Sequence, residues 1–297
     1  MFKDKKAIDL HVNVGDRVGD SYYDGAVDGE NLRRQFSPVR LINTNLRKIG
    51  LRTHYSLVKI PGGYESMFIP SVSINWIGMN PVLVEEHLNH FSHPRPILWF
   101  QSFRDPYHKR VVDDKYRNSI AYSGEEAVTV THTDDYGRLT INCMEVLEVA
   151  RDKRAIIATP HSNWERTVPL IVNAIEMGLS VLWTHPDSRL IKTPIGIQRM
   201  LTGQYPGKLF VERAAVFIRD GKPGYYSPGQ VVEDMRVMGS SHIIFTSDSG
   251  RYNPNDPLMP DEALLWYFDQ LVNAGLTIEE AEMGLVINPS KLLEDQT

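Results

Sequence analysis

The segment AIDLHVN (Ala7–Asn13), which leads into VGD (Val14–Asp16), decides between two folds that the chain's alternating pattern allows. A short, nearly continuous apolar run of this kind is typical of a parallel strand that is buried on both faces. In a dinucleotide-binding sheet, a Gly-rich phosphate turn follows the first strand. Here neither GxGxxG nor a Walker loop occurs anywhere in the chain. The segment therefore favours the first strand of a closed barrel over that of an open doubly wound sheet.

Similar apolar runs recur along the chain, and longer amphipathic segments separate them, as in βα units. The predicted strands are Ala7–Asn13, Leu51–Leu57, Phe68–Trp76, Pro96–Phe103, Ala155–His161, Ser180–His185, Lys208–Val216 and His242–Asp248. The predicted helices are Pro81–Phe91, Ile141–Ala150, Asn163–Met177, Val231–Met238, Pro260–Ala274 and Thr277–Met283. This order predicts an α/β fold, a (β/α)8 TIM barrel that forms a single domain over residues 1–297. Long polar loops follow the first and fourth strands, at Gly15–Phe36 and Arg104–Gly137.

Composition narrows the classes of partner. The net charge of −5 argues against general binding of nucleic acid or of an anionic membrane, because the chain has no basic excess. No apolar run approaches the roughly 18 residues that suggest a membrane span. Cys143 is the only cysteine and lies in an apolar helical segment, so we expect a buried structural thiol. We expect a cytoplasmic protein that acts on a small molecule, with barrel helices that are compatible with a homo-oligomer.

Metal-binding residue types stand at the predicted carboxyl ends of five strands. They are His11 and Asn13 on the first strand, His54 on the second, His161 on the fifth, His185 on the sixth and Asp248 on the eighth. In a closed parallel barrel these ends surround one cavity, so the side chains converge although they are far apart in sequence. Imidazole and carboxylate are the ligands that a catalytic zinc ion prefers. The pattern predicts a metal site at this end of the barrel.

This pattern resembles the amidohydrolase superfamily, whose barrel carries His-x-His after strand one, His after strands five and six, and Asp after strand eight. The matching segments are Ile8–Asn13, Ala158–His161, Thr184–Pro186 and Thr246–Asp248. The tail Asn288–Leu293 is similar to an Asn-Pro-Ala-x-Leu-Leu ending, and Thr53-His54 resembles the Ser-His of one subgroup. The resemblance implies a metal-dependent hydrolase.

The departure from the family pattern is Asn13, which stands where the second histidine is expected. An amide oxygen is a weak neutral ligand, and His54 is the nearest candidate to compensate. The fourth strand ends Trp99–Ser102, without a lysine that could bridge two metals. We therefore expect one divalent ion rather than two, with zinc preferred and manganese or iron as alternatives.

The chemistry and the resemblance together suggest roles for these residues. His11 and His161 would be metal ligands, with Asn13 and His54 as further candidates. Asp248 would be a ligand, a general base or both. His185 would bind the metal, polarise the substrate carbonyl or hydrogen-bond the attacking water. Two more residues are assigned to the substrate: Arg52, which would bind a carboxylate, and Glu212, for which an ion pair with Arg213 is the alternative.

This set of residues is compatible with three functions. The first is hydrolysis of an amide, lactam or ester-like bond by water that a metal activates. The second is metal-dependent non-oxidative decarboxylation or another carbon–carbon lyase reaction. The third is a barrel without catalysis that binds a small ligand, which the change to Asn13 makes credible. The histidines of Pro81–Phe91 are expected on the surface, whereas His108 and His132 flank the second long loop and are candidates to reach the site.

Overall fold

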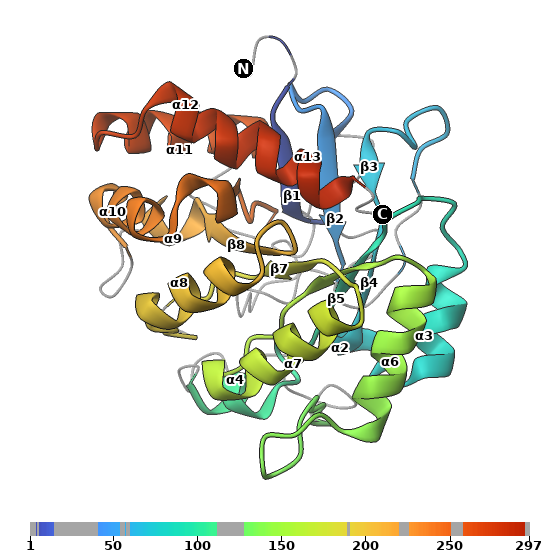
Figure 1. Cartoon of the computed structure of the whole chain (residues 1–297). Coiled ribbons are helices and arrows are strands. Elements are labelled where there is room, and N and C mark those ends of the chain that lie inside the picture. The colour runs from blue at the N-terminus through green and yellow to red at the C-terminus, as the bar shows by residue number, and fades with distance from the viewer. Residues whose placement is uncertain are drawn as a thin grey trace, which may run out of the picture.

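The structure, a computed structural model, describes residues 4, 6–14, 41–53, 57, 60–111, 128–188, 191–219, 226–250 and 258–294 (Figure 1). The loop predicted at Gly15–Phe36 lies outside the described residues, as does His54. The described strands are β1 (Ile8–Asn13), β2 (Lys48–Arg52), β3 (Phe68–Ile69), β4 (Ser71–Ser73), β5 (Ile97–Trp99), β6 (Ile156–Ala158), β7 (Val181–Trp183), β8 (Leu209–Ala214) and β9 (Ile243–Thr246).

All strand pairs are parallel and follow the chain order, in two runs, β1-β2-β3 and β4 to β9. Only Pro70 separates β3 from β4, and proline has no N–H for the ladder. Its carbonyl still accepts a hydrogen bond from the Ile97 amide at 3.0 Å, so β3 and β4 are halves of one strand. The two runs therefore join into a single series of eight parallel strands.

The first and last strands of this series also meet. Val12 forms a parallel bridge with Ser249, and the Asn13 amide donates to the Ser249 carbonyl at 2.7 Å. This contact brings β1 against the end of β9 and closes the ring. The predicted (β/α)8 barrel is confirmed.

Helices lie around the outside of the strands (Figure 1). They are α2 (Ile74–Ile77), α3 (Pro81–Leu88), α4 (Pro106–Val111), α6 (Ile141–Asp152), α7 (Trp164–Glu176), α8 (Ile195–Gln204), α9 (Val216–Arg219), α10 (Pro228–Met238), α11 (Pro260–Asn273), α12 (Ile278–Glu282), a π-helical turn η6 (Met283–Ile287) and α13 (Asn288–Leu293), with a 3₁₀ turn η5 at Ser240–His242. None of the helices in the described part of the chain is long and apolar enough to cross a membrane.

Several predicted boundaries are wrong. β2 begins at Lys48, three residues before the predicted start, and ends at Arg52. The predicted strand Phe68–Trp76 ends at Ser73, whose side chain caps the short helix α2. Helix α8 was not predicted, because glycines at 196 and 203 interrupt its pattern.

Two apolar layers separate the barrel interior from the helical ring. The interior cluster takes side chains from seven of the strands, as expected when the inner faces fill a small barrel. Its members are Ile8, Leu10, Ile69, Ile97, Trp99, Ile156, Ala158, Leu182, Phe210, Ile244 and Leu292 of α13. Strand β2 contributes none, since its inward position at this level is Gly50. The alternate strand residues, such as Val211 and Phe245, join the larger cluster that includes the helices.

A β-bulge in β1 turns His11 into the barrel. Asp9 pairs with Ile49 and Val12 with Leu51, so β1 has one more residue than β2 between these pairs. Leu10 belongs to the interior cluster, and the next residue, His11, also faces inward with its ring 4.6 Å from that of Trp99. Bulges re-aim side chains in this way and are frequent next to active sites.

Gly50 accommodates this bulge, because a Cβ at that position would lie 2.3 Å from the carbonyl oxygen of Leu10. We expect Gly50→Ala to lower the free energy of unfolding by about 1–3 kcal/mol through this overlap. Gly196→Ala is the control, because a Cβ on that glycine of α8 meets nothing within 4 Å. It should leave stability unchanged or raise it by up to about 1 kcal/mol. Chemical denaturation measures both, and equal stability of the two variants would contradict the role of Gly50.

Candidate metal centre

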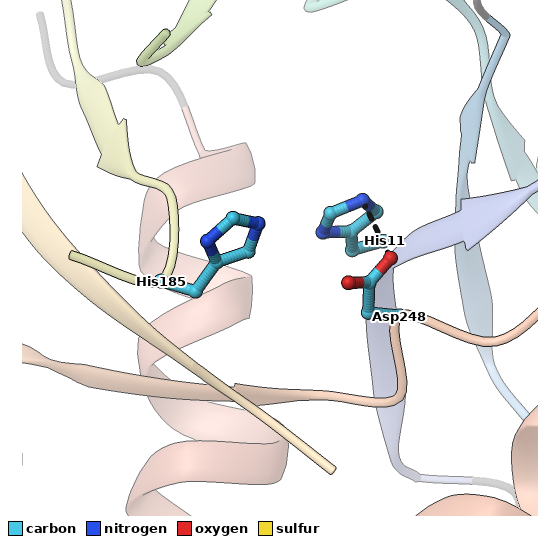
Figure 2. A group of neighbouring side chains, drawn as sticks. All are labelled: His11, His185 and Asp248. Atoms are coloured by element: carbon cyan, nitrogen blue, oxygen red, sulfur yellow. Dashed lines mark ion pairs between the residues drawn. The ribbon is translucent and has the colours of Figure 1, made fainter. Parts of the chain in front are cut away.

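Three side chains converge at the carboxyl end of the barrel. His11 comes from β1, His185 from the segment after β7, and Asp248 from the segment after β9 (Figure 2). One ligand atom of each lies within 4.8 Å of the others, and all three residues are fully buried. We call these residues the triad. It contains three of the six residues that the sequence pattern assigned to the metal.

The backbone is strained at two of the three residues. His185 has φ = 24° and Asp248 has φ = 48°, the left-handed region that L-residues with side chains rarely adopt. Such conformations cost on the order of 1–3 kcal/mol each and persist where surrounding contacts impose them. One such contact is the His185 amide, which donates to Oε2 of Glu212 at 3.0 Å. Strain of this kind clusters at functional sites.

Glu212 sets the orientation of the His11 ring. Its Oε1 lies 2.7 Å from Nδ1 of His11. Because a carboxylate only accepts, Nδ1 carries the proton of this hydrogen bond, and the other ring nitrogen, Nε2, lies 3.1 Å from Asp248 Oδ1. Metal-ligating histidines have this arrangement, with the second ring nitrogen bound to a carboxylate.

Glu212 therefore lies behind His11, and its contact with a substrate stays a prediction. It is fully buried, and Oε1 also accepts a hydrogen bond from the Thr246 hydroxyl at 2.7 Å. The alternative for Glu212 was an ion pair with Arg213, for which the structure gives two other carboxylates. The Arg213 guanidinium lies on the other side of β8, 3.3 Å from Asp187 and 3.8 Å from Asp234.

Asn13 contacts Asp248 through its amide nitrogen. Nδ2 donates to Oδ1 of Asp248 at 2.9 Å and to the Ser249 carbonyl at 3.1 Å. Two acceptors at this atom fix the orientation of the amide, and an amide N–H is not a metal ligand. In this geometry the amide nitrogen of Asn13 holds the Asp248 carboxylate.

His161 lies beside the triad without joining it. Its ring packs edge-on against that of His185, with centroids 4.7 Å apart. Its Nδ1 is 3.0 Å from Nδ1 of His108, which is on α4 in the second long loop. His108 thus reaches the site, as the sequence allowed, whereas His132 bonds instead to Gln101 at 2.7 Å and to the Arg166 carbonyl at 3.0 Å.

Comparisons with known proteins bear on the fold. A putative 2-pyrone-4,6-dicarboxylic acid hydrolase from Pseudomonas putida has a similar structure, with a TM-score of 0.50 and 15% identity, and 97% of each chain is covered. An amidohydrolase from Pseudomonas aeruginosa has a TM-score of 0.50 and 11% identity, over 99% of this chain and 97% of that one. At these identities the likeness shows the fold alone, a (β/α)8 barrel that this chain shares with both proteins. A model of a family of unknown function, DUF6282, matches residues 63–205, and no curated protein matches the sequence.

At the carboxyl end of this barrel the triad has the donor set of a catalytic metal site. It offers two imidazole nitrogens and one carboxylate oxygen, and three protein ligands are usual for catalytic zinc. With bonds of about 2.1 Å, the ligand atoms of a tetrahedral ion lie about 3.4 Å apart. The 3.1 Å between His11 Nε2 and Asp248 Oδ1 fits such an ion, and a ligand atom of His185 lies within 4.8 Å of those of the other two residues. The residues therefore fit a divalent metal.

Arg52 and Trp99 line the same end of the barrel. Arg52 is the last residue of β2 and is 2% exposed. Its Nη1 lies 2.6 Å from Nε2 of His11, and its guanidinium carbon lies 4.7 Å from the centre of the Trp99 ring. The sequence did not indicate that Trp99 would be in contact with His11, because no tryptophan belongs to the family pattern on which the prediction rests.

A second buried polar cluster follows β5. The Gln101 amide donates to Asp105 Oδ2 at 3.0 Å and to His132 Nδ1 at 2.7 Å. Burial raises the pKa of Asp105 from the ordinary 3.8 to about 7, against the opposing effect of hydrogen bonds from the Tyr107 amide and Gln101. Burial lowers the pKa of His132 to about 4. Burial thus favours the neutral form of both groups.

This raised pKa predicts a pH-dependent stability. The folded pKa of Asp105 lies above the unfolded one, so folding takes up a proton between about pH 4 and 7, and stability falls as pH rises through that window. In Asp105→Asn we expect the loss of unfolding free energy from pH 5 to pH 8 to shrink by about 2–3 kcal/mol. Urea titrations of both proteins at pH 5 and pH 8 measure this loss. The His132 contribution is common to both proteins, and an unchanged difference would show that Asp105 ionises normally.

Proposed function

We propose that the chain is a metal-dependent hydrolase that cleaves an amide, lactam or ester-like bond of a small molecule with one divalent ion. Zinc suits the nitrogen and carboxylate donors best, with manganese or iron as alternatives. The observation that carries the proposal is the convergence of His11, His185 and Asp248 with Glu212 behind His11. When bound, such an ion polarises a carbonyl and lowers the pKa of a water molecule toward 7.

The proposal gives each residue a distinct task. His11 and His185 hold the ion through imidazole nitrogens, and Glu212 keeps the Nε2 of His11 turned toward it. His161, next to His185, remains a candidate for a further ligand or for a contact with the substrate carbonyl. His54 and Asn13 remain predictions as ligands, and the hydrogen bonds of Asn13 favour its role in holding Asp248.

Asp248 is the proposed proton carrier. Its carboxylate takes the proton of the attacking water and delivers it to the leaving group. Asn13 donates to Oδ1, which fixes the plane of the carboxylate relative to His11. The left-handed backbone at Asp248 supports this assignment, because the position has to be held against strain.

Arg52 is the proposed contact for an anionic group of the substrate. Its guanidinium is buried, lies against Trp99 and borders His11, so its donors are close to the reacting bond. Guanidinium binds carboxylates through paired hydrogen bonds. The similar structure from Pseudomonas putida carries the name of a dicarboxylic acid hydrolase, which agrees with an anionic substrate. We therefore propose small carboxylated lactones, lactams and esters as the substrate class.

Turnover in oxygen-18 water tests the reaction type. The zinc-loaded protein is assayed with a panel of small lactones, lactams and esters, with and without a carboxylate. Hydrolysis predicts that one solvent oxygen enters the product and that the carboxylated members react faster. Release of carbon dioxide without solvent oxygen in the product would instead support the decarboxylase alternative. Binding of panel members without conversion would support a barrel that only binds a ligand.

A further inference from the structure

We propose that Arg52 and the metal ion compete for Nε2 of His11, so that Arg52 is an internal cation that must leave His11 before the ion binds. This inference rests on the metal site proposed above. It concerns the affinity of that site rather than its reaction.

His11 has one lone pair to give. Its Nδ1 is 2.7 Å from Glu212 Oε1 and donates to it, so only Nε2 can accept. Nη1 of Arg52 lies 2.6 Å from that atom. A guanidinium has no acceptor, so Arg52 is the donor and occupies the lone pair. A metal ion needs the same lone pair, and the two interactions exclude each other.

The carboxylates around His11 also need a cation. His11 lies between two fully buried carboxylates, 2.7 Å from Glu212 and 3.1 Å from Asp248. Buried carboxylates require a nearby positive charge or several hydrogen bonds, because their desolvation is costly. Arg52, which is 2% exposed, brings one positive charge to this place. A divalent ion brings two, so either cation can balance the group.

Arg52 also has a place next to the site when it leaves His11. Its guanidinium carbon lies 4.7 Å from the centre of the Trp99 ring, and the Trp99 ring is itself 4.6 Å from that of His11. Stacking on tryptophan stabilises a guanidinium through the ring face and leaves its N–H groups available. A short movement along this ring would turn those donors from His11 toward the anionic group of the substrate.

The test compares zinc affinity in metal-stripped wild type, Arg52→Met and Arg95→Met by competition with a chromogenic chelator. Arg95 is the matched control, a buried arginine that bonds to Ser180 at 3.0 Å on a different part of the barrel. We expect Arg52→Met to bind zinc at least about tenfold more tightly, since a hydrogen bond to a charged group no longer has to break. Arg95→Met should bind zinc as wild type does. Arg52→Gln, which keeps an uncharged N–H donor on a shorter side chain, should show a smaller gain and serves if the methionine variant does not fold.

Thermal unfolding without metal gives a second measurement. Arg52→Met should melt below wild type, because His11 and Asp248 lose their cation, and added zinc should restore more stability to the variant than to wild type. Equal or weaker zinc affinity in both Arg52 variants would overturn the competition while leaving the metal site in place. Absence of zinc binding in wild type and in every variant would overturn the metal site and this inference together. Binding only in the Arg52 variants would support the competition in its strongest form.

Discussion

Asp248→Asn is expected to lower zinc affinity by more than about a hundredfold and to remove hydrolysis. The carboxylate is the only anionic member of the triad, and its Oδ1 lies 3.1 Å from Nε2 of His11. Loss of a supporting partner of a metal ligand already costs about 10–100-fold in affinity, so loss of a charged ligand should cost more. The amide also places an N–H group where Asn13 already donates, at 2.9 Å from Oδ1.

Calorimetric titration with zinc and measurement of bound metal by mass spectrometry test this expectation. Asp134→Asn is the control, because Asp134 accepts hydrogen bonds from the amides of Tyr136 and Arg138 in an exposed turn. It should bind zinc as wild type does. If Asp248→Asn kept wild-type affinity, Asp248 would not be a ligand, and the proposed centre would have to be drawn around other residues.

Glu212→Gln is expected to have the second-largest effect, a loss of about 10–100-fold in zinc affinity. Glu212 accepts hydrogen bonds from the His11 ring, the Thr246 hydroxyl and the His185 amide, all in a fully buried place. An amide keeps one acceptor oxygen and replaces the other with a donor, so at least one of these three groups loses its partner. The free energy of unfolding should fall by about 1–3 kcal/mol as well.

The same titration, together with chemical denaturation of the metal-stripped protein, measures both effects. Glu279→Gln changes the same chemical group at an exposed position of α12 and should alter neither. A Glu212 variant with unchanged stability and weakened hydrolysis alone would favour the substrate contact that the sequence first suggested. A loss of both affinity and stability is what its buried position behind His11 predicts.

The barrel could be predicted because each strand is a short apolar run that a helical pattern follows. The ends of strands could not be predicted where the local sequence pattern fits two kinds of structure. At β2 the strand begins before Gly50, a residue that usually weakens a strand and here allows the close approach of Leu10. At Phe68–Ser73 the apolar pattern continues into Ile74, but Ser73 caps a helix and ends the strand.

The three triad residues were predictable, because each stands at the end of a strand and the barrel brings those ends together. The contacts between them were not. Residue type alone does not show that Asn13 directs its nitrogen to Asp248, or that Glu212 reaches His11 across 201 positions of sequence. The bulge that turns His11 inward adds one residue to β1, and the alternation of the sequence gives no sign of it.

The histidines on the outer helix show the opposite case. The sequence predicts them on the surface, and this prediction is confirmed. His87 and His90 lie on or next to α3, and their Nδ1 atoms bond to the carbonyls of Leu83 and Glu86 in the preceding turn. Their spacing resembles a metal motif, but within the described residues only His11, His185 and Asp248 form a group that could hold an ion. Position in the barrel, more than spacing in the sequence, distinguishes the triad from these surface histidines.

The most direct test of the central claim is anomalous diffraction at the zinc absorption edge from crystals of the zinc-loaded protein. The proposed centre predicts one strong peak within about 2.0–2.2 Å of Nε2 of His11, an oxygen of Asp248 and a ring nitrogen of His185. The competition proposed for Arg52 predicts that its guanidinium no longer contacts His11 in that crystal. A peak only at surface histidines such as His87 and His90, or none at a zinc concentration far above that of the protein, would contradict the account.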